Sequence, residues 1–211
     1  MVRNLPFNDH VDEYEAWFEK YPFVFETELA AIKKIWPVAK DAMSLEVGSG
    51  TGRFSKALGI RCGLEPSANM DAMAEERGIE TVRGVAEEMP YQSQQFDVVL
   101  MNFCISYFEN LPRAFAEAFR VLKSGGTLIV GFIDKNSLLG KYYESKRDKS
   151  IFYKAANYYS VKEVEEKIND AGFNNQQFFQ TLFSDLDKTN TVEPLSPGYG
   201  KGSYILIKAT K

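Results

Sequence analysis

The sequence contains few of the residues that bind metals or form disulfides. Its 211 residues include two cysteines, Cys62 and Cys104, and a single histidine, His10. Two cysteines do not build a disulfide framework or, with one histidine, a metal cluster, so we expect both to be reduced and packed. The sequence therefore predicts no metal centre.

The sequence also has no excess of positive charge and no long apolar run. Its 25 Lys and Arg residues are outnumbered by 29 Asp and Glu residues, which gives a net charge of −4 and makes nucleic acid a disfavoured partner. No apolar run reaches the roughly 18 residues of a membrane span, and the N-terminal residues lack a signal-peptide pattern. We therefore expect a cytoplasmic protein with no membrane partner.

Length and composition are those of a globular chain. At 211 residues, with 45% hydrophobic and 26% charged residues, the chain is long enough for a sizeable core. No internal repeat or linker divides it. We expect residues 1–211 to form a single domain.

Glycine is concentrated where a short apolar segment ends. Residues 42–47 predict a buried strand, and Gly48, Gly50 and Gly52 follow it before a helical pattern begins. In a strand, glycine-rich turn and helix, backbone amides and the helix N-terminus can bind a polar ligand. Glycine permits both the sharp turn and the close approach of the ligand. We interpret this glycine-rich turn, residues 48–52, as part of a cofactor site.

The glycine spacing argues against a dinucleotide cofactor. A dinucleotide fingerprint has the spacing G-x-G-x-x-G. Counted from Gly48, its third glycine would fall at Arg53, and the actual spacing is G-x-G-x-G. The stretch LEVGSGTGRF resembles motif I of the class I S-adenosylmethionine-dependent methyltransferases. Four later segments resemble further motifs of that family in the family's order, so the resemblance covers roughly residues 41–132. These segments are residues 63–70, 84–91, 96–100 and 120–128.

The resemblance implies a three-layer α/β fold with a Rossmann-like sheet. We expect seven strands in the order 3-2-1-4-5-7-6, with the last strand antiparallel, and a Gly125–Gly126 turn into the fifth strand at Thr127. Leu45–Val47, Val98–Met101 and Leu128–Val130 are continuous apolar runs, as is typical of strands covered on both faces. The antiparallel strand rests on the resemblance alone.

The N-terminal part, residues 1–37, predicts a helical cap that precedes the motifs. Pro22 separates two helices, and either Asn8 or Asp9 is expected to cap the first of them. The residues at helical spacing are Val11, Tyr14, Trp17 and Phe18 in the first helix and Phe25, Leu29, Ile32, Ile35 and Trp36 in the second.

Residues 134–159 form an insert after the fifth strand, rich in Lys and Tyr and only moderately helical in pattern. We expect it on the substrate side of the domain. Ser160 is expected to cap the helix that follows.

The family resemblance implies S-adenosylmethionine as the cofactor. Glu65 ends the second strand, 17 residues after Gly48, where a carboxylate can accept hydrogen bonds from both hydroxyls of a ribose. The expected cofactor-binding residues are Glu46, Gly48, Ser49, Gly50, Gly52, Glu65, Pro66, Met70, Ala86, Glu87, Asn102, Tyr14 and Trp17.

Two parts of this predicted site have open alternatives. Adenine is expected against Met70 and Met89, but family members often carry an acid where this sequence has Val85, so recognition falls to Glu87, the backbone or water. The aromatic residues of the first helix either close over the cofactor or only pack against the domain.

Methyl transfer from a sulfonium is an in-line displacement, in which the cofactor carries the activated group. The protein orients both ligands and excludes water, and it needs a general base only if the nucleophile arrives protonated. Candidates for a base are His10, Asp134, Tyr158 and Tyr159. Arg53 either binds a carboxylate or is solvated.

We therefore expect an enzyme that transfers a methyl group from S-adenosylmethionine to a small-molecule acceptor. A non-catalytic S-adenosylmethionine-binding protein is an alternative, and an NAD-dependent oxidoreductase is less favoured. The aromatic residues of the cap and the insert suit a small, partly apolar or cationic acceptor, with Tyr158 or Tyr159 facing the methyl group. The rival interpretation is that these tyrosines only pack the insert against the core.

Overall fold

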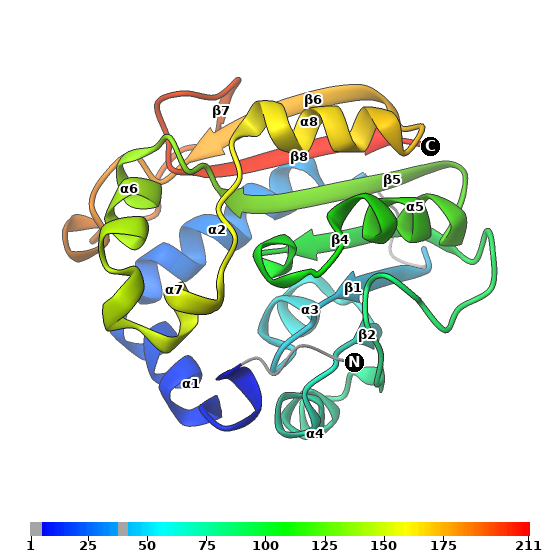
Figure 1. The fold of residues 1–211 in the computed structure, drawn as a ribbon, viewed down its shortest axis with the longest axis horizontal. Helices are drawn as coiled ribbons and strands as arrows, with labels where there is room; N and C mark the ends of the chain where they lie inside the picture. Colours follow the sequence, from blue (N-terminus) through cyan, green and yellow to red (C-terminus); the bar gives the residue numbers. More distant parts are fainter. Residues whose placement is uncertain (1–5, 38–41) are drawn as a thin grey trace.

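The computed structural model describes residues 6–37 and 42–211, which fold around one mixed sheet (Figure 1). The strands are β1 (Ser44–Val47), β2 (Cys62–Leu64), β3 (Glu80–Val82), β4 (Phe96–Asn102), β5 (Leu122–Ile133), β6 (Asn174–Thr181), β7 (Ser196–Pro197) and β8 (Tyr204–Thr210). Their order is β3-β2-β1-β4-β5-β8-β6-β7. Strands β1 to β5 are parallel, and β8 runs antiparallel between β5 and β6.

The predicted order with its antiparallel last strand is confirmed, but the sheet has eight strands rather than seven. The additional strand is the two-residue β7, which pairs with β6 through Phe179–Pro197 and Gln180–Ser196 at the edge. So short a strand carries no periodic pattern, and only its pairing partner reveals it.

Helices cover both faces of the sheet and complete the three layers. The helices and 3-10 turns are η1 (Pro6–Asn8), α1 (Val11–Lys20), α2 (Pro22–Ile35), α3 (Arg53–Leu58), α4 (Ala68–Glu76), η2 (Cys104–Tyr107), α5 (Leu111–Val121), α6 (Leu138–Ser145), η3 (Arg147–Lys149), α7 (Ile151–Ala155), α8 (Val161–Asp170) and η4 (Leu186–Lys188). Phe115 of α5 and Val164 of α8 lie in the core on one face. Ile32 of α2 and Phe54 of α3 lie in the core on the other face.

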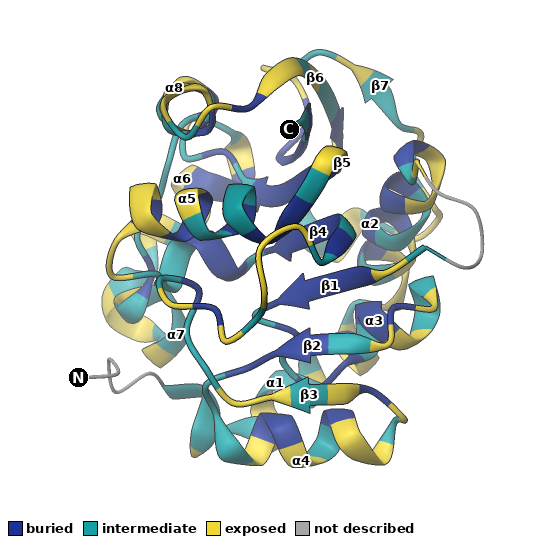
Figure 2. Ribbon diagram, turned by 90° about the vertical axis from the view of Figure 1, so that its right-hand side faces the viewer, coloured by how far each residue is buried: buried dark blue, intermediate teal, exposed yellow. Residues whose placement is uncertain are grey.

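The inner strands are buried, as their continuous apolar runs predicted. Every residue of β1 is buried, and so is β4 except for the half-buried Asp97. Figure 2 shows this contrast, with β1, β2, β4 and β5 dark and the edge strand β3 largely exposed. Helices on both faces exclude water from the inner strands, whereas β3 has a neighbour on one side only.

The predicted cap of the first helix is wrong. Helix α1 begins at Val11 after His10, with no hydrogen bond from a capping side chain. The Oδ1 atom of Asn8 instead accepts hydrogen bonds from the Ser67 hydroxyl at 3.3 Å and from the backbone amide of Asn69 at 3.2 Å. These groups belong to the start of α4, whose first backbone amides lack partners within the helix. Asn8 therefore ties the N-terminal segment to α4.

The fifth strand begins earlier than predicted, at Leu122 rather than at Thr127, so the predicted turn at Gly125–Gly126 lies inside β5. Gly125 has a positive φ of 75°, and the pairing with β4 shifts register between Leu122 and Thr127, so the chain bulges at these glycines. The backbone amide of Gly125 donates to the carbonyl of Lys211, and the amide of Lys211 donates to the carbonyl of Gly126. This pairing with the end of the chain extends the strand through both glycines.

The insert is more helical than its pattern indicated, since it contains α6, η3 and α7. The hydroxyls of Ser137 and Ser150 accept hydrogen bonds from backbone amides in the first turns of α6 and α7. Serine caps thus start two short helices whose apolar spacing is too brief to be distinctive. The predicted cap at Ser160 is confirmed, and with Glu163 it forms a capping box.

The strand directions locate the functional end of the molecule. The carboxyl ends of β1, β4 and β5 point to one side, where α1, α6 and α7 gather (Figure 1). Open parallel sheets bind ligands at this end, so the cap and the insert flank the expected site.

Candidate cofactor and acceptor site

A cavity of about 1360 Å³ runs along the carboxyl ends of the strands. It exceeds the roughly 300–1,000 Å³ typical of a pocket for one small molecule. Its walls come from η1, α1, the glycine-rich turn, the segments after β2, β3 and β4, and the insert. The volume can hold a cofactor and a second ligand together.

The glycine-rich turn requires glycine both for its backbone conformation and for space. Gly48, Gly50 and Gly52 have φ angles of 67°, 54° and 78°, in the left-handed region. A Cβ added to Gly48 would lie 2.5 Å from the Cβ of Cys104, and one added to Gly50 would lie 3.2 Å from the hydroxyl of Tyr14. Gly48 and Gly50 line the cavity, whereas Gly52 lies outside its lining.

Glu65 lines the cavity after β2, with its carboxylate fixed by two backbone amides. Oε2 accepts a hydrogen bond from Gly50 N, and Oε1 accepts one from Ser67 N, each at 2.9 Å. Burial raises the pKa of Glu65 to about 7 although both hydrogen bonds favour the ionised form. Each oxygen keeps acceptor capacity, so a ribose diol can bind to this carboxylate.

Glu46 lies behind the glycine-rich turn rather than in the cavity wall. Its side chain is buried, and its carboxylate accepts a hydrogen bond from the hydroxyl of Ser55 in α3. Burial raises the pKa of Glu46 to about 8, while the Ser55 hydrogen bonds lower it and the nearby Glu65 raises it. This geometry favours a supporting role for Glu46, which would hold β1 and α3 together beneath the turn.

The structure brings most of the predicted cofactor residues together around the cavity. Ser49, like Glu46 and Gly52, does not line it, and Met89 is buried outside the lining. The predicted residues in the lining are Gly48, Gly50, Glu65, Pro66, Met70, Ala86, Glu87, Asn102, Tyr14 and Trp17.

The side chain of Glu87 already has backbone partners. Its Oε1 atom accepts hydrogen bonds from the amides of Glu109 at 2.7 Å and Asn110 at 3.1 Å, just before α5. Its carbonyl accepts one from Arg113 Nε at 2.7 Å. Glu87 thus joins the segment after β3 to the start of α5, and this contact shapes the cavity wall.

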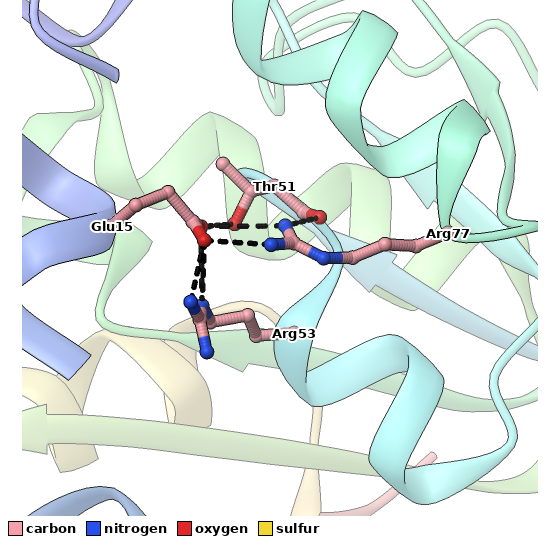
Figure 3. Close-up of polar contacts among 4 residues, drawn as sticks. All are labelled: Glu15, Thr51, Arg53 and Arg77. Atoms are coloured by element: carbon pink, nitrogen blue, oxygen red, sulfur yellow. Dashed lines mark hydrogen bonds and ion pairs between the residues drawn. The ribbon is translucent and has the colours of Figure 1, made fainter. Parts of the chain in front are cut away.

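Helix α1 is fixed to the glycine-rich turn by Glu15 (Figure 3). The carboxylate accepts hydrogen bonds from Arg53 Nη2 at 2.5 Å, Arg77 Nη2 at 2.6 Å and Thr51 Oγ1 at 2.5 Å. Burial alone would raise the pKa of Glu15, but these three donors together lower it to about 2. Arg53 is therefore paired rather than solvated. Tyr14 and Trp17, on the same helix, are held against the cavity.

The cap and the insert meet over the remaining part of the cavity. The rings of Phe7 in η1 and Phe152 in α7 are 5.3 Å apart, and within the insert the rings of Tyr143 in α6 and Tyr153 in α7 are 4.5 Å apart. The aromatic residues in the lining are Phe7, Tyr14, Trp17, Phe18, Phe54, Phe103, Tyr107, Phe108, Phe132, Tyr143, Phe152, Tyr153 and Tyr158.

Glu28 of α2 is a cavity residue that the sequence pattern did not predict. Its side chain is 2% exposed and lines the cavity, and its Oε2 atom has no hydrogen-bond partner among the described residues. Burial raises the pKa of Glu28 well above its usual range. A glutamate among apolar helix positions was the available signal, but the pattern alone did not show which face of α2 is buried.

The four candidate bases lie in different places. His10 forms a 3.0 Å contact with Glu13 on the surface and is not in the lining. Asp134 is buried outside the lining, where its carboxylate accepts a hydrogen bond from Asn136 N at 3.1 Å. Tyr158 lines the cavity, whereas Tyr159 packs against the core.

Other kinds of site are not evident in the part of the chain that the structure describes. Within residues 6–37 and 42–211, no group of three or more His, Cys, Asp or Glu side chains is placed to hold a metal ion. No helix in these ranges is long and apolar enough to cross a bilayer.

Comparisons with known proteins match this arrangement. Residues 45–130 match the family model for a methyltransferase domain. The uncharacterized protein MJ1123 of Methanocaldococcus jannaschii is 40% identical over 205 residues, which are 97% of this chain and 98% of that protein. Phosphoethanolamine N-methyltransferase 2 of Caenorhabditis elegans is 26% identical over 189 residues, and the match covers 81% of this chain but only 42% of that enzyme.

A solved structure supports the same assignment over the whole length. The protein TM1293 of Thermotoga maritima, described as a SAM-dependent methyltransferase and possible histamine N-methyltransferase, is 40% identical to this chain. The two superpose with a TM-score of 0.94, and the match covers 97% of this chain and 98% of that protein. The turn and the carboxylate that can hold a sulfonium nucleoside are both present in this chain. The chain therefore belongs to the S-adenosylmethionine-dependent methyltransferases, and S-adenosylmethionine is its cofactor.

Proposed function

We propose that this methyltransferase acts on a small molecule and that residues 1–211 form one catalytic domain. The observation that carries the proposal is the continuity of the cavity. Gly50 and Glu65 border it, and so do Tyr143 and Tyr153 of the insert. A small acceptor can therefore enter the same cavity as the cofactor, with no separate surface required for a macromolecule.

We propose that some residues around the cavity bind the cofactor and that others align the acceptor. Gly48, Gly50 and Glu65 would hold the polar parts of the cofactor, and Met70 and Ala86 would contact its adenine. The bound cofactor supplies a methyl group that is already activated on a sulfonium. The chain must then align the acceptor and keep out water, which is the role we propose for the N-terminal cap and the insert.

The walls of the cavity favour a nitrogen acceptor. Aromatic faces attract cations by about 0.5–2 kcal/mol and also bury apolar area. Two of the matched proteins carry names that refer to amine methylation, namely the possible histamine N-methyltransferase of Thermotoga maritima and the phosphoethanolamine N-methyltransferase of Caenorhabditis elegans. We therefore propose N-methylation of a small amine.

A transfer assay tests this proposal. The protein is incubated with S-adenosylmethionine labelled in its methyl group and a panel of amines, including histamine, beside phenols, quinols and carboxylates. We expect label in one or more amines and none in the other classes. A Glu65→Gln variant controls for transfer that does not depend on the cofactor site. Cofactor binding without transfer to any amine of the panel would contradict the proposal.

A further inference from the structure

Helix α2 buries one acidic side chain in the stripe that faces the core. Its buried positions follow the 3.6-residue period of a helix, and Glu28 occupies one of them. The buried residues of α2 are Val24, Thr27, Glu28, Ala31, Ile32 and Ile35. Carboxylates are almost never fully buried unless they are paired, so the position of Glu28 requires an explanation.

The neighbouring buried polar residue, Thr27, has hydrogen-bond partners for its hydroxyl group. Thr27 Oγ1 donates to the carbonyl of Phe23 at 2.7 Å and accepts from the amide of Glu193 at 3.0 Å. In contrast, Oε2 of Glu28 has no partner among the described residues. Burial raises the pKa of Glu28, and no described cation lowers it. The fold leaves this carboxyl group without a counterion of its own.

Glu28 shares the cavity wall with aromatic and phenolic side chains. Glu28 and Tyr143 both line the cavity. Burial raises the pKa values of Tyr143 and Tyr204, and the charge of Glu28 contributes to both increases. The cationic side chains in the lining are Arg83, which follows β3, and Arg113 of α5, and neither has a hydrogen bond or ion pair with Glu28 among the described residues.

We propose that Glu28 binds the basic nitrogen of the methyl acceptor as an ammonium, so that the acceptor is a cationic amine. The ammonium then passes one proton to the Glu28 carboxylate, because only the neutral amine has the lone pair that forms the new N–C bond as the bond from the methyl group to sulfur breaks. This inference rests on the proposed small-molecule activity and adds the residue that recognises the substrate. The proposal gives the orphan oxygen of Glu28 a partner, because an ammonium group donates charge-assisted hydrogen bonds to a carboxylate. The aromatic side chains around it would cover the remaining faces of the cation.

The same geometry predicts strong selection between an amine and an alcohol of the same shape. An alcohol offers one neutral donor and leaves the buried carboxyl group without a charged partner. A site built around a buried polar group rejects analogues that leave that group unpaired. A hydrogen bond to a charged group contributes about 1.5–3 kcal/mol, so the preference should be roughly 10- to 100-fold.

Calorimetry with matched probes tests the inference independently of turnover. The protein is saturated with S-adenosylhomocysteine and titrated with three pairs of compounds, butylamine and butanol, 2-phenylethylamine and 2-phenylethanol, and tryptamine and tryptophol. The variant is Glu28→Gln, which keeps the shape and removes the charge. The matched control is Glu26→Gln, which makes the same change at an exposed position of the same helix.

We expect the wild-type protein and Glu26→Gln to prefer the amine by roughly 10- to 100-fold in at least one pair. In Glu28→Gln this preference should fall below about threefold, while affinity for S-adenosylhomocysteine and the melting temperature are not reduced. These two readouts separate a lost binding group from a lost fold. Partial recovery in Glu28→Asp would support the role of the charge.

Three results would overturn the inference. They are equal binding of amine and alcohol by the wild-type protein in every pair, no binding of any amine, and an unchanged preference in Glu28→Gln. A failure of the proposed function looks different. In that case the amine preference and its dependence on Glu28 would be present, but no bound amine would become methylated.

Discussion

The guanidinium of Arg77 donates a hydrogen bond of 2.6 Å to the carboxylate of Glu15, a residue that lies 62 positions earlier in the chain. Arg77 also donates through Nη1 to the carbonyl of Thr51, inside the glycine-rich turn. Three segments therefore meet at one carboxylate, namely α1, the turn and the end of α4 (Figure 3). The position of the N-terminal cap is therefore coupled to the conformation of the glycine-rich turn.

Replacing Glu15 by Gln should loosen this coupling. Two arginines would lose their shared counterion in a region where the side chains are only 15–26% exposed, so we expect a loss of about 1–3 kcal/mol in the free energy of unfolding. Cofactor affinity should fall, and hydrogen exchange in α1 should become faster. Glu19→Gln, at an exposed position of the same helix, is the control. Unchanged exchange in α1 would show that Glu15 does not hold the cap.

Replacing Glu65 by Gln should weaken the binding of S-adenosylmethionine. The amide can still accept a hydrogen bond from Gly50 N, but it loses the charge that strengthens bonds from ribose hydroxyls. We expect a loss of about 2–3 kcal/mol, or roughly 30- to 150-fold in affinity by calorimetry. Glu80→Gln in β3 should bind normally. An affinity for Glu65→Gln within twofold of the wild type would remove Glu65 from the binding site.

Glycine substitutions separate backbone strain from steric conflict. Gly48 and Gly59 both have positive φ, but an added Cβ would meet Cys104 at 2.5 Å in the first case and no atom within 4 Å in the second. Gly59→Ala should therefore cost only about 1–2 kcal/mol of stability, from the backbone alone. Gly48→Ala should cost about 2–5 kcal/mol. Chemical denaturation measures both, and equal losses would contradict the steric argument.

The buried glutamates should make the protein less stable as the pH rises. Burial raises the pKa of Glu46 to about 8 and of Glu65 to about 7, against the usual value of 4.5. At pH values between 4.5 and these raised pKa values, Glu46 and Glu65 hold protons in the folded state that they have released in the unfolded chain. The free energy of unfolding therefore falls from about pH 5 to pH 8. The contribution is fully present below pH 4.5. A series of melting temperatures should show this slope, and Glu46→Gln should reduce it.

The affinity for S-adenosylmethionine should change with pH in the opposite direction. The ionised form of Glu65 is the better acceptor for ribose hydroxyls, so binding should tighten as the pH rises through about 7. In Glu65→Gln this dependence should be absent. Calorimetric titrations at several pH values between 6 and 8.5 measure it, and a slope retained by the variant would assign it to another group.

The strand order came from the family resemblance. The sequence alone determined the positions of the inner strands and of the cofactor turn. Both rest on local features, because continuous apolar runs mark strands covered on both faces and Gly48 and Gly50 stand where the chain must turn with positive φ. Glu65 was also predictable, since a fixed number of residues separates it from the turn. The direction of the last strand came from the family resemblance rather than from its residues.

Only the tertiary structure decided which acidic residues are solvated. Glu15 and Glu28 both lie on predicted helices, and spacing alone does not distinguish them from surface glutamates such as Glu19 and Glu26. Glu15 is paired because Arg53 and Arg77 reach it from segments 38 and 62 residues away. Glu28 is buried because the rotation of α2 against the sheet directs that position inward. Such contacts depend on how helices pack, which no local pattern encodes.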